Sequence, residues 1–518
     1  MSQAIMGAAT VIIGLLVLGV SIATLIVTST HLHKSPENHH SSHKQHSSHP
    51  LHGQEVWGSE APPIDALTFF SQVAMNLSAF DHTPLSTHIP GQQRTIAGEH
   101  TGPLRAARAL AIVHVAMADV VAIVTRAFAP YANGAESLMD TDACKNVAID
   151  AAIGAAAKTT LQWLYRGQQR AIVRIWSEFH ARLPKTAAVQ KGIAFGETVA
   201  NLIIVQRKND GASLAVDPPA EEYESNEPGK WRRDPVAQHD IALGATWATH
   251  VQPFTLSQAS QFTCPPPPNL TSPEYSMEFY ETCALGGEPG SPDGCVRDEW
   301  RTFVGQFWAY DGTSGICAPA RLYLQMVHVV LNQDFRHLDL AARARIIGLS
   351  VLAMGDAGLA AWHSKWLYRR ERPVTAIRES ALFDGNPLTT ANPHWIPLGA
   401  PNTNSPEKPN FSPNFAAFPS GHAAFGGAMT QVLRRVLGTD EARLVFVSDE
   451  FNGHAIDAQT NLPRKRVERW FSSFSEMEEE NGQSRVYLGI HWSSDKTAGI
   501  AQGRLVADWT ISHAYRPL

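Results

Sequence analysis

The sequence has no excess of positive charge, which is the first absence that limits what the protein does. Its 518 residues contain 42 Lys and Arg against 48 Asp and Glu, a formal net charge of −6 at pH 7. Nucleic-acid-binding domains usually carry a basic excess or a basic stripe. We therefore expect no nucleic-acid partner, while a local pocket for a small anion remains compatible with the overall charge.

Cysteines are few, and none of them is spaced as a CxxC pair. The five are Cys144, Cys264, Cys283, Cys295 and Cys317. Without paired cysteine motifs a structural zinc site is not indicated. Four of them fall within 54 residues that are also rich in Pro and Gly. This grouping predicts one or two disulfides in an external loop region, with at least one free thiol.

The N-terminus lacks charge over a long stretch. Residues 4–28 contain no charged side chain and exceed the roughly 20 residues that span a bilayer. The stretch also lacks the basic start and small-residue cleavage site of a signal peptide. We expect residues 1–30 to be a membrane anchor carrying an extracytoplasmic catalytic part; if the segment is a cleaved signal, the protein is secreted. Residues 31–56 follow, a His-rich tract whose composition predicts a disordered tether.

Strand-like alternation is scarce in the remaining chain, so the predicted fold class is all-α. Helices are expected over 104–129, 144–166, 168–183, 186–207, 319–331, 338–371, 420–437 and 491–514, with 239–317 mostly irregular. We expect an N-terminal helical half over 57–300 and a C-terminal helical bundle over 301–518. His114 lies in an Ala-rich apolar helix and is interpreted as a hydrogen-bonded core residue.

The stretch "WHSKWLYRRERP", residues 362–373, is the first that could carry chemistry. Lys365 and Arg372 are seven residues apart, two helical turns, and so project from one face. Pro373 disfavours helical geometry at Arg372, which places that residue at the helix end. A solvated basic face is the alternative explanation for this segment.

The stretch "FPSGHAAFGG", residues 418–427, has the features of a helix start. Ser420 stands where an N-cap residue belongs, and the first amides of a helix have no partner inside it. Gly421 permits a close backbone approach, so an oxyanion can be held there. His422 would lie beside that anion as a proton donor or acceptor. A capped helix with an incidental histidine is the alternative.

The stretch "SRVYLGIHWSSD", residues 484–495, supplies Arg485, His491 and Asp495. A carboxylate one helical turn beyond a histidine can orient the imidazole, although a charge at a helix start explains it equally well. Three fixed cations, backbone donors and two histidines can stabilise a tetrahedral or pentacoordinate oxyanion. This combination suits phosphoryl transfer and vanadate chemistry alike.

The three stretches resemble the signature of a superfamily that joins type-2 phosphatidic acid phosphatases, bacterial acid phosphatases and vanadium-dependent haloperoxidases. Chain length and the stretches "FWAYDGT", "HWIPLGAPN" and "SDEFNG" are most similar to the fungal-type vanadium chloroperoxidases. The resemblance extends over roughly residues 60–518 and implies two helical bundles. It does not include the expected anchor and tether.

The resemblance implies vanadate as the cofactor, with His491 as its axial ligand. The vanadate oxygens would be held by Lys365, Arg372, Ser420, Gly421 and Arg485. His422 would be the acid–base group, and Lys365 would help to polarise the reacting oxygen. The implied reaction is oxidation of chloride or bromide by hydrogen peroxide to hypohalous acid, which halogenates an organic acceptor.

The resemblance also implies roles for neighbouring side chains. Trp362 and Phe415 would line the halide pocket; algal bromoperoxidases usually carry histidine where Phe415 stands. Asp311 would pair with Arg485, and Asp495 would support His491. Two alternatives remain: a membrane-associated acid or lipid phosphatase that uses a phosphohistidine intermediate, and a non-catalytic protein with a relict site.

Overall fold

The computed structural model describes residues 65–87, 94–237, 239–289, 295–405 and 407–518. The predicted anchor over 1–30 and the predicted tether over 31–56 lie outside the described residues. The described part is mostly helical, as the sequence predicted. The predicted division of the chain near residue 300 stays a prediction.

The first half of the described chain is built from five long helices. They are α2 (Ala66–Asp81), α3 (Pro103–Thr125), α4 (Ile149–Leu164), α5 (Gln169–His180) and α6 (Ala187–Lys208). Helix α3 is apolar over most of its surface, and almost all of its side chains are buried because other helices surround it. His114 lies inside α3 with no exposed surface, in agreement with its interpretation as a core residue.

The second half supplies the remaining helices and the sheet. The helices are α7 (Trp247–His250), α8 (Pro273–Gly286), α9 (Glu299–Phe307), α10 (Pro319–Gln333), α11 (Leu340–Tyr368), α12 (Pro373–Arg378), α13 (Gly421–Leu437), α14 (Phe474–Tyr487) and α15 (Ser493–His513). The strands β1 (Glu441–Phe446) and β2 (Arg469–Ser473) form an antiparallel pair. This small sheet is the exception to the all-α prediction.

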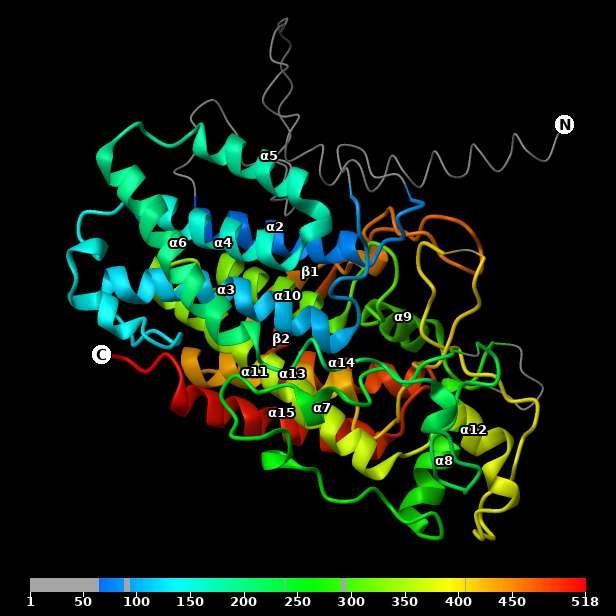
Figure 1. Ribbon diagram of the computed structural model, residues 1–518. Helices are drawn as coiled ribbons and strands as arrows, with labels where there is room; N and C mark the ends of the chain where they lie inside the picture. The colour runs from blue at the N-terminus through cyan, green and yellow to red at the C-terminus, as the bar shows by residue number, and fades with distance from the viewer. Residues whose placement is uncertain (1–64, 88–93, 238, 290–294, 406) are drawn as a thin grey trace, which may run out of the picture.

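Helix α11 connects the two halves. It packs against α3 on one side and against α13 and α15 on the other, and Figure 1 shows it running between the blue-to-cyan N-terminal helices and the orange and red C-terminal ones. One large buried cluster contains side chains of all four helices. The ends of α11, α13 and α15 are therefore fixed relative to one another by a continuous core.

Four helices, α8, α9, α14 and α11, differ from the sequence-based expectation. Helices α8 and α9 lie in the stretch 239–317 that was expected to be mostly irregular, and each begins at a capping side chain, Ser272 or Asp298. Helix α14 was not predicted because its sequence is mostly polar and has no apolar periodicity. Helix α11 ends at Tyr368, three residues earlier than expected, because Arg369 adopts a left-handed conformation.

Within the described part, helices α3, α6 and α11 are long and apolar enough to cross a membrane by length and composition. The most apolar stretches of α3 and α11 are 94% buried inside the protein. Their apolar character is thus explained by the core.

Two of the four cysteines in the Pro- and Gly-rich region, where one or two disulfides were expected, form no disulfide. Cys264 and Cys317 are free, buried thiols. The Cys264 backbone amide donates a hydrogen bond to Ser364 Oγ in α11. Both cysteines pack as small core side chains, which is common for buried thiols.

Candidate active site

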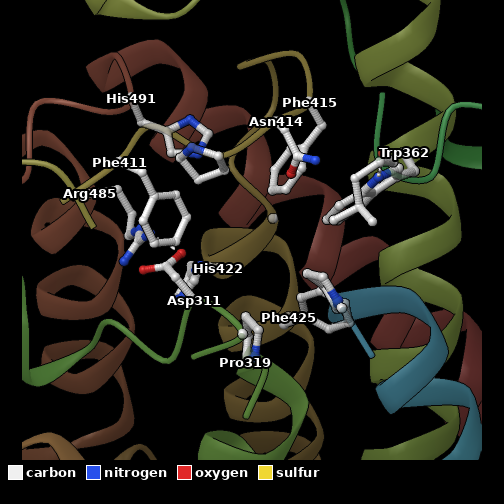
Figure 2. Close-up of a pocket in the computed structure, with 16 residues that line it drawn as sticks. Asp311, Pro319, Trp362, Phe411, Asn414, Phe415, His422, Phe425, Arg485 and His491 are labelled. Atoms are coloured by element: carbon white, nitrogen blue, oxygen red, sulfur yellow. Dashed lines mark hydrogen bonds and ion pairs between the residues drawn. The ribbon is translucent and has the colours of Figure 1, made fainter. Parts of the chain in front are cut away.

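A pocket of about 170 Å³ lies where α11, α13, α14 and α15 meet. Figure 2 shows Arg485, Asp311 and Phe411 on one side of it, with Trp362 on the opposite side and His491 and Phe415 at one end. The predicted site residues that line the pocket are Asp311, Trp362, Phe415, Gly421, His422, Arg485 and His491. Lys365, Arg372, Ser420 and Asp495 are buried just behind this lining.

Lys365 lies in the last turn of α11 and has no exposed surface. Its ammonium donates to the carbonyl oxygens of Ala416 (2.9 Å), Ala417 (2.8 Å) and Pro419. These carbonyls belong to the segment that leads into α13. The lysine therefore binds the segment directly before the start of α13, and all three of its N–H groups have acceptors.

Arg372 does not share a helix face with Lys365, contrary to the sequence-based prediction, but is brought to the site by the turn that follows α11. Helix α11 has ended at Tyr368, and Arg372 is the N-cap residue of α12. Its Nε donates to Phe415 O (2.9 Å), and its Nη1 donates to Ile490 O (2.7 Å). Arg372 is 1% exposed, so the alternative of a solvated basic face is wrong for this residue.

Ser420 caps α13, and its Oγ accepts a hydrogen bond from Ala423 N at 3.4 Å. Gly421 begins the helix, where a side chain would press on the Trp362 ring, since its Cβ would come within 3.1 Å of that ring. His422 follows in the first turn, and its Nε2 lies 2.5 Å from Ala309 O. Because a carbonyl only accepts, Nε2 carries the proton and Nδ1 keeps its lone pair.

His491 lies two residues before α15, and Asp495 lies in the first turn of that helix. Asp495 Oδ2 accepts from His491 Nδ1 at 2.8 Å and from Trp492 N at 3.1 Å. Asp495 thus both orients the imidazole and caps the helix. The lone pair of His491 is then on Nε2, which accepts from Arg372 Nη1 at 2.9 Å.

Arg485 comes from the last turn of α14 and pairs with Asp311, with 2.6 Å between Nη2 and Oδ1. Within the described part of the chain, Arg485 Nε and Nη1 and Arg372 Nη2 are buried donors without a hydrogen-bond partner. Unpartnered donors of buried cations are costly, and an anion in the pocket would satisfy them. The donor set therefore fits a tetrahedral or pentacoordinate oxyanion.

Burial controls the protonation of the site. Burial lowers the pKa of both His422 and His491 well below the usual histidine value, and the nearby arginines add to this effect. Both imidazoles are therefore neutral at physiological pH, so that each has a free lone pair. Burial also lowers the pKa of Lys365 well below its usual value and that of Arg372 to about 9.

An aromatic pair forms the apolar side of the pocket. The rings of Trp362 and Phe415 lie 4.8 Å apart between centroids, inclined by 46°. The Arg372 guanidinium lies 4.8 Å from the Phe415 ring centroid and the Lys365 ammonium 5.2 Å from it. Trp362 is held by its own hydrogen bond to Leu243 O at 3.1 Å. The pocket thus joins an apolar wall to buried positive charge.

Sequence reasoning missed several groups that hold the site together. Asn481 Nδ2 donates to the backbone oxygen of His422 at 3.0 Å, and the Tyr323 hydroxyl lies within hydrogen-bond distance of that oxygen (2.9 Å) and of Asn481 Oδ1 (2.7 Å). The Ala309 carbonyl fixes the tautomer of His422. The stretch "FWAYDGT" was the available signal for Ala309, whereas nothing local marks Tyr323 or Asn481.

Comparisons of the sequence with protein families and with individual proteins both point to vanadium chloroperoxidases. Residues 345–518 match the family described as the VCPO second helical-bundle domain. The vanadium chloroperoxidase of Curvularia inaequalis is 28% identical over 512 residues, which cover 83% of this chain and 79% of that protein. The signature residues from Lys365 to His491 all fall inside the matched bundle.

Two solved structures share the fold. A bacterial vanadium-dependent iodoperoxidase superposes with a TM-score of 0.66 at 20% identity, covering 88% of this chain and 99% of that one. A bacterial vanadium-dependent chloroperoxidase gives 0.60 at 15% identity, covering 84% and 95%. The matching second bundle, the long alignment with the chloroperoxidase and the shared fold together support a vanadium haloperoxidase.

Proposed function

We propose that this protein binds vanadate in the pocket between α11, α13 and α15 and oxidises chloride or bromide with hydrogen peroxide. The hypohalous acid formed would halogenate small organic acceptors. The observation that carries this proposal is the group of buried guanidinium donors that lack partners beside the His491 lone pair. The Curvularia relative is a vanadium chloroperoxidase, which supports chloride as a substrate.

Each anion-holding residue has a separate role. His491 Nε2 would be the ligand to vanadium, once Arg372 Nη1 gives up its bond to that nitrogen and keeps its bond to Ile490 O. Arg372 Nη2 together with Arg485 Nε and Nη1 would donate to vanadate oxygens. When bound, vanadate supplies a Lewis-acidic centre that activates hydrogen peroxide without changing its own oxidation state.

The backbone at the start of α13 completes this cradle. The Gly421 amide belongs to the first turn of the helix, where N–H groups have no partner within the helix. We therefore expect this amide to donate a hydrogen bond to one of the vanadate oxygens. Ser420 caps the same turn and lies directly behind it. Lys365 fixes the preceding carbonyls and adds positive charge from behind the aromatic pair.

His422 is the proposed acid–base group. Its neutral ring holds a proton at Nε2, bonded to Ala309 O, so Nδ1 is the position that can take a proton from hydrogen peroxide. The protonated ring can then return that proton to a leaving oxygen. Trp362 and Phe415 would exclude water from the halide, which makes the anion a better nucleophile.

The decisive experiment uses the protein freed of metal. Halogenation of a diketone dye with hydrogen peroxide is measured with and without added vanadate, alongside hydrolysis of an aryl phosphate. We expect halogenation only with vanadate. Phosphate hydrolysis without halogenation would overturn the proposal in favour of a phosphatase with a phosphohistidine at His491. The relatives described above are peroxidases, so the phosphatase is not favoured.

We also propose that residues 1–30 anchor the protein in a membrane, with the catalytic part on the extracytoplasmic side. The support is the uncharged stretch 4–28. Alkaline carbonate extraction of cells that express the full chain should leave it in the membrane pellet. A chain beginning at residue 57 should be released, and a full chain that is also released would contradict the anchor.

A further inference from the structure

A buried ion pair lies behind His491, and neither of its two residues is among the predicted site residues. Arg370 follows the left-handed turn after α11, and Glu278 lies in α8. They are 4% and 3% exposed, and Arg370 Nη2 donates directly to Glu278 Oε1. Two buried charges in contact are costly to maintain unless their remaining hydrogen-bonding positions are also satisfied.

The other hydrogen bonds of the two side chains are made with residues in the first turn of α15. Arg370 Nη1 donates to Asp495 Oδ1 at 3.1 Å and to Ser494 Oγ at 2.7 Å. Glu278 Oε2 accepts from the Ser494 backbone amide at 3.1 Å. The guanidinium also lies 5.3 Å from the centroid of the Trp492 ring. The pair therefore contacts three of the four residues that directly follow the histidine.

Asp495 has its two carboxylate oxygens divided between the two sides of this network. Oδ2 accepts a hydrogen bond from His491 Nδ1, and Oδ1 accepts one from Arg370 Nη1. A carboxylate held on one oxygen alone can rotate about its side-chain torsions, whereas one held on both cannot. Arg370 thus fixes the carboxylate plane, and the carboxylate in turn fixes the ring plane of His491.

We propose that Arg370 and Glu278 are positioning residues that hold His491 in the orientation needed to bond vanadium. Arg370 acts through Asp495, and Glu278 acts by holding both Arg370 and the first turn of α15. The inference rests on the proposed function, because it assigns to His491 the bond to vanadium. It adds helix α8, which lies outside the matched second bundle, to the elements that determine cofactor affinity.

The test compares the metal-free wild type with Arg370→Met, Arg370→Lys and Glu278→Gln. Each protein is titrated by calorimetry with vanadate and, separately, with inorganic phosphate, and its apo melting temperature is recorded. Asp210→Asn is the matched control, since Asp210 forms an equally buried pair with Arg108, away from the pocket lining.

We expect vanadate affinity to fall about tenfold or more in Arg370→Met and Glu278→Gln, as for other residues that orient metal ligands. Arg370→Lys should retain part of the affinity, because it keeps the charge but not the two-sided fork. Phosphate affinity should stay within about twofold, because phosphate relies on the cations and not on a bond from His491. Asp210→Asn should lower the melting temperature without changing vanadate affinity.

Two results would overturn the inference while leaving the proposed function intact. One is vanadate affinity within twofold of wild type in folded Glu278→Gln and Arg370→Lys. The other is an equal loss of vanadate and phosphate affinity, which would mean that the cradle as a whole had been disrupted. A wild-type protein that binds phosphate but no vanadate would overturn both proposals.

Discussion

The protein contains two buried groups that each combine one serine with two histidines. One lies in the core between α2, α3 and α10 and consists of Ser71, His114 and His328. The other lies at the starts of α13 and α15 and contains Ser420, with the two histidines that line the pocket. In both groups burial lowers the histidine pKa values; for His114 and His328 these are about 4 and about 3.

The two groups differ in what surrounds them. In the core group, His114 Nδ1 donates to Leu110 O, so its Nε2 accepts from the Ser71 hydroxyl, which in turn accepts from His328 Nε2. This arrangement is complete with neutral side chains, apart from His328 Nδ1, which has no partner among the described residues. The pocket group instead faces unpartnered guanidinium donors and open volume.

Residue types, burial and lowered pKa values are therefore shared by a structural cluster and a candidate catalytic one. The distinguishing features are buried cationic donors without acceptors and a cavity that an anion can enter. An unpaired lone pair on a neutral ring costs little in comparison with an unpaired donor on a charged group. Variants in the two groups should accordingly affect stability in one case and anion binding in the other.

The largest contrast is expected between His491→Ala and His114→Ala. Loss of the proposed vanadium ligand should reduce vanadate-dependent halogenation by about a thousandfold or more, because the chemistry depends on that bond. His114→Ala should leave vanadate affinity unchanged but lower the free energy of unfolding by about 2–4 kcal/mol through the cavity it creates. Turnover assays and denaturant unfolding of the two variants measure both effects. Full activity in His491→Ala would show that the ligand assignment is wrong.

A second contrast concerns two buried arginines. Arg485→Lys keeps a charge beside Asp311 but removes the unpartnered Nε and Nη1 donors, so vanadate should bind about 10–100-fold more weakly, with little change in melting temperature. In Arg108→Lys the lost donors were already bonded to Asp210, so stability should fall and vanadate affinity should not. Equal vanadate affinity in both variants would contradict the role given to the orphan donors.

Much of the site could be predicted because its residues occur in three short stretches, in which the residue types and their spacing indicate an oxyanion site. Ser420 as a helix cap and the His491–Asp495 pair follow from local rules of helix starts. The position of Arg372 could be reached only in part, since a left-handed residue at Arg369, which sequence propensity disfavours, turns the chain there. Contacts across the fold, such as Glu278 with Arg370, leave no pattern in the chain because they join segments far apart in sequence.

The same reasoning explains the success and failure for whole elements. Helices α3 and α11 are long, Ala-rich and buried, so composition alone identified them. Helix α14 places Arg485 in the site, yet it is stabilised by tertiary contacts that its polar sequence does not display. The β1–β2 pair is too short to create an alternation that stands out from its surroundings.

The core histidines also predict how stability depends on pH. In the folded state His328 stays neutral down to a pKa of about 3, whereas in the unfolded chain it takes up a proton near pH 6.5. Protons then bind preferentially to the unfolded state, so stability falls as pH falls below 6.5. Between pH 8 and pH 5 this costs about 2 kcal/mol for each such histidine.

His328→Gln removes one of these groups and should flatten the pH dependence by about that amount. Denaturant unfolding at pH 8 and pH 5, for this variant and the wild type, measures the difference. His337 lies close in sequence but is exposed at the surface, and His337→Gln serves as the control that should not flatten the profile. An unchanged slope in His328→Gln would show that its ring is protonated in the folded protein.

The smallest expected effect concerns the apolar wall of the pocket, formed by Trp362 and Phe415. The serine–histidine group in the core has no corresponding role in binding a halide. Phe415→His would place a polar ring between Trp362 and the Arg372 guanidinium and admit water beside the halide. Chloride holds its hydration shell more tightly than bromide, so the chlorination rate should fall on the order of tenfold relative to bromination. Phe425→Leu, which keeps another part of the lining apolar, should leave that ratio unchanged. An equal ratio in Phe415→His and wild type would mean that halide choice is set elsewhere, and that the aromatic pair serves only to close the pocket.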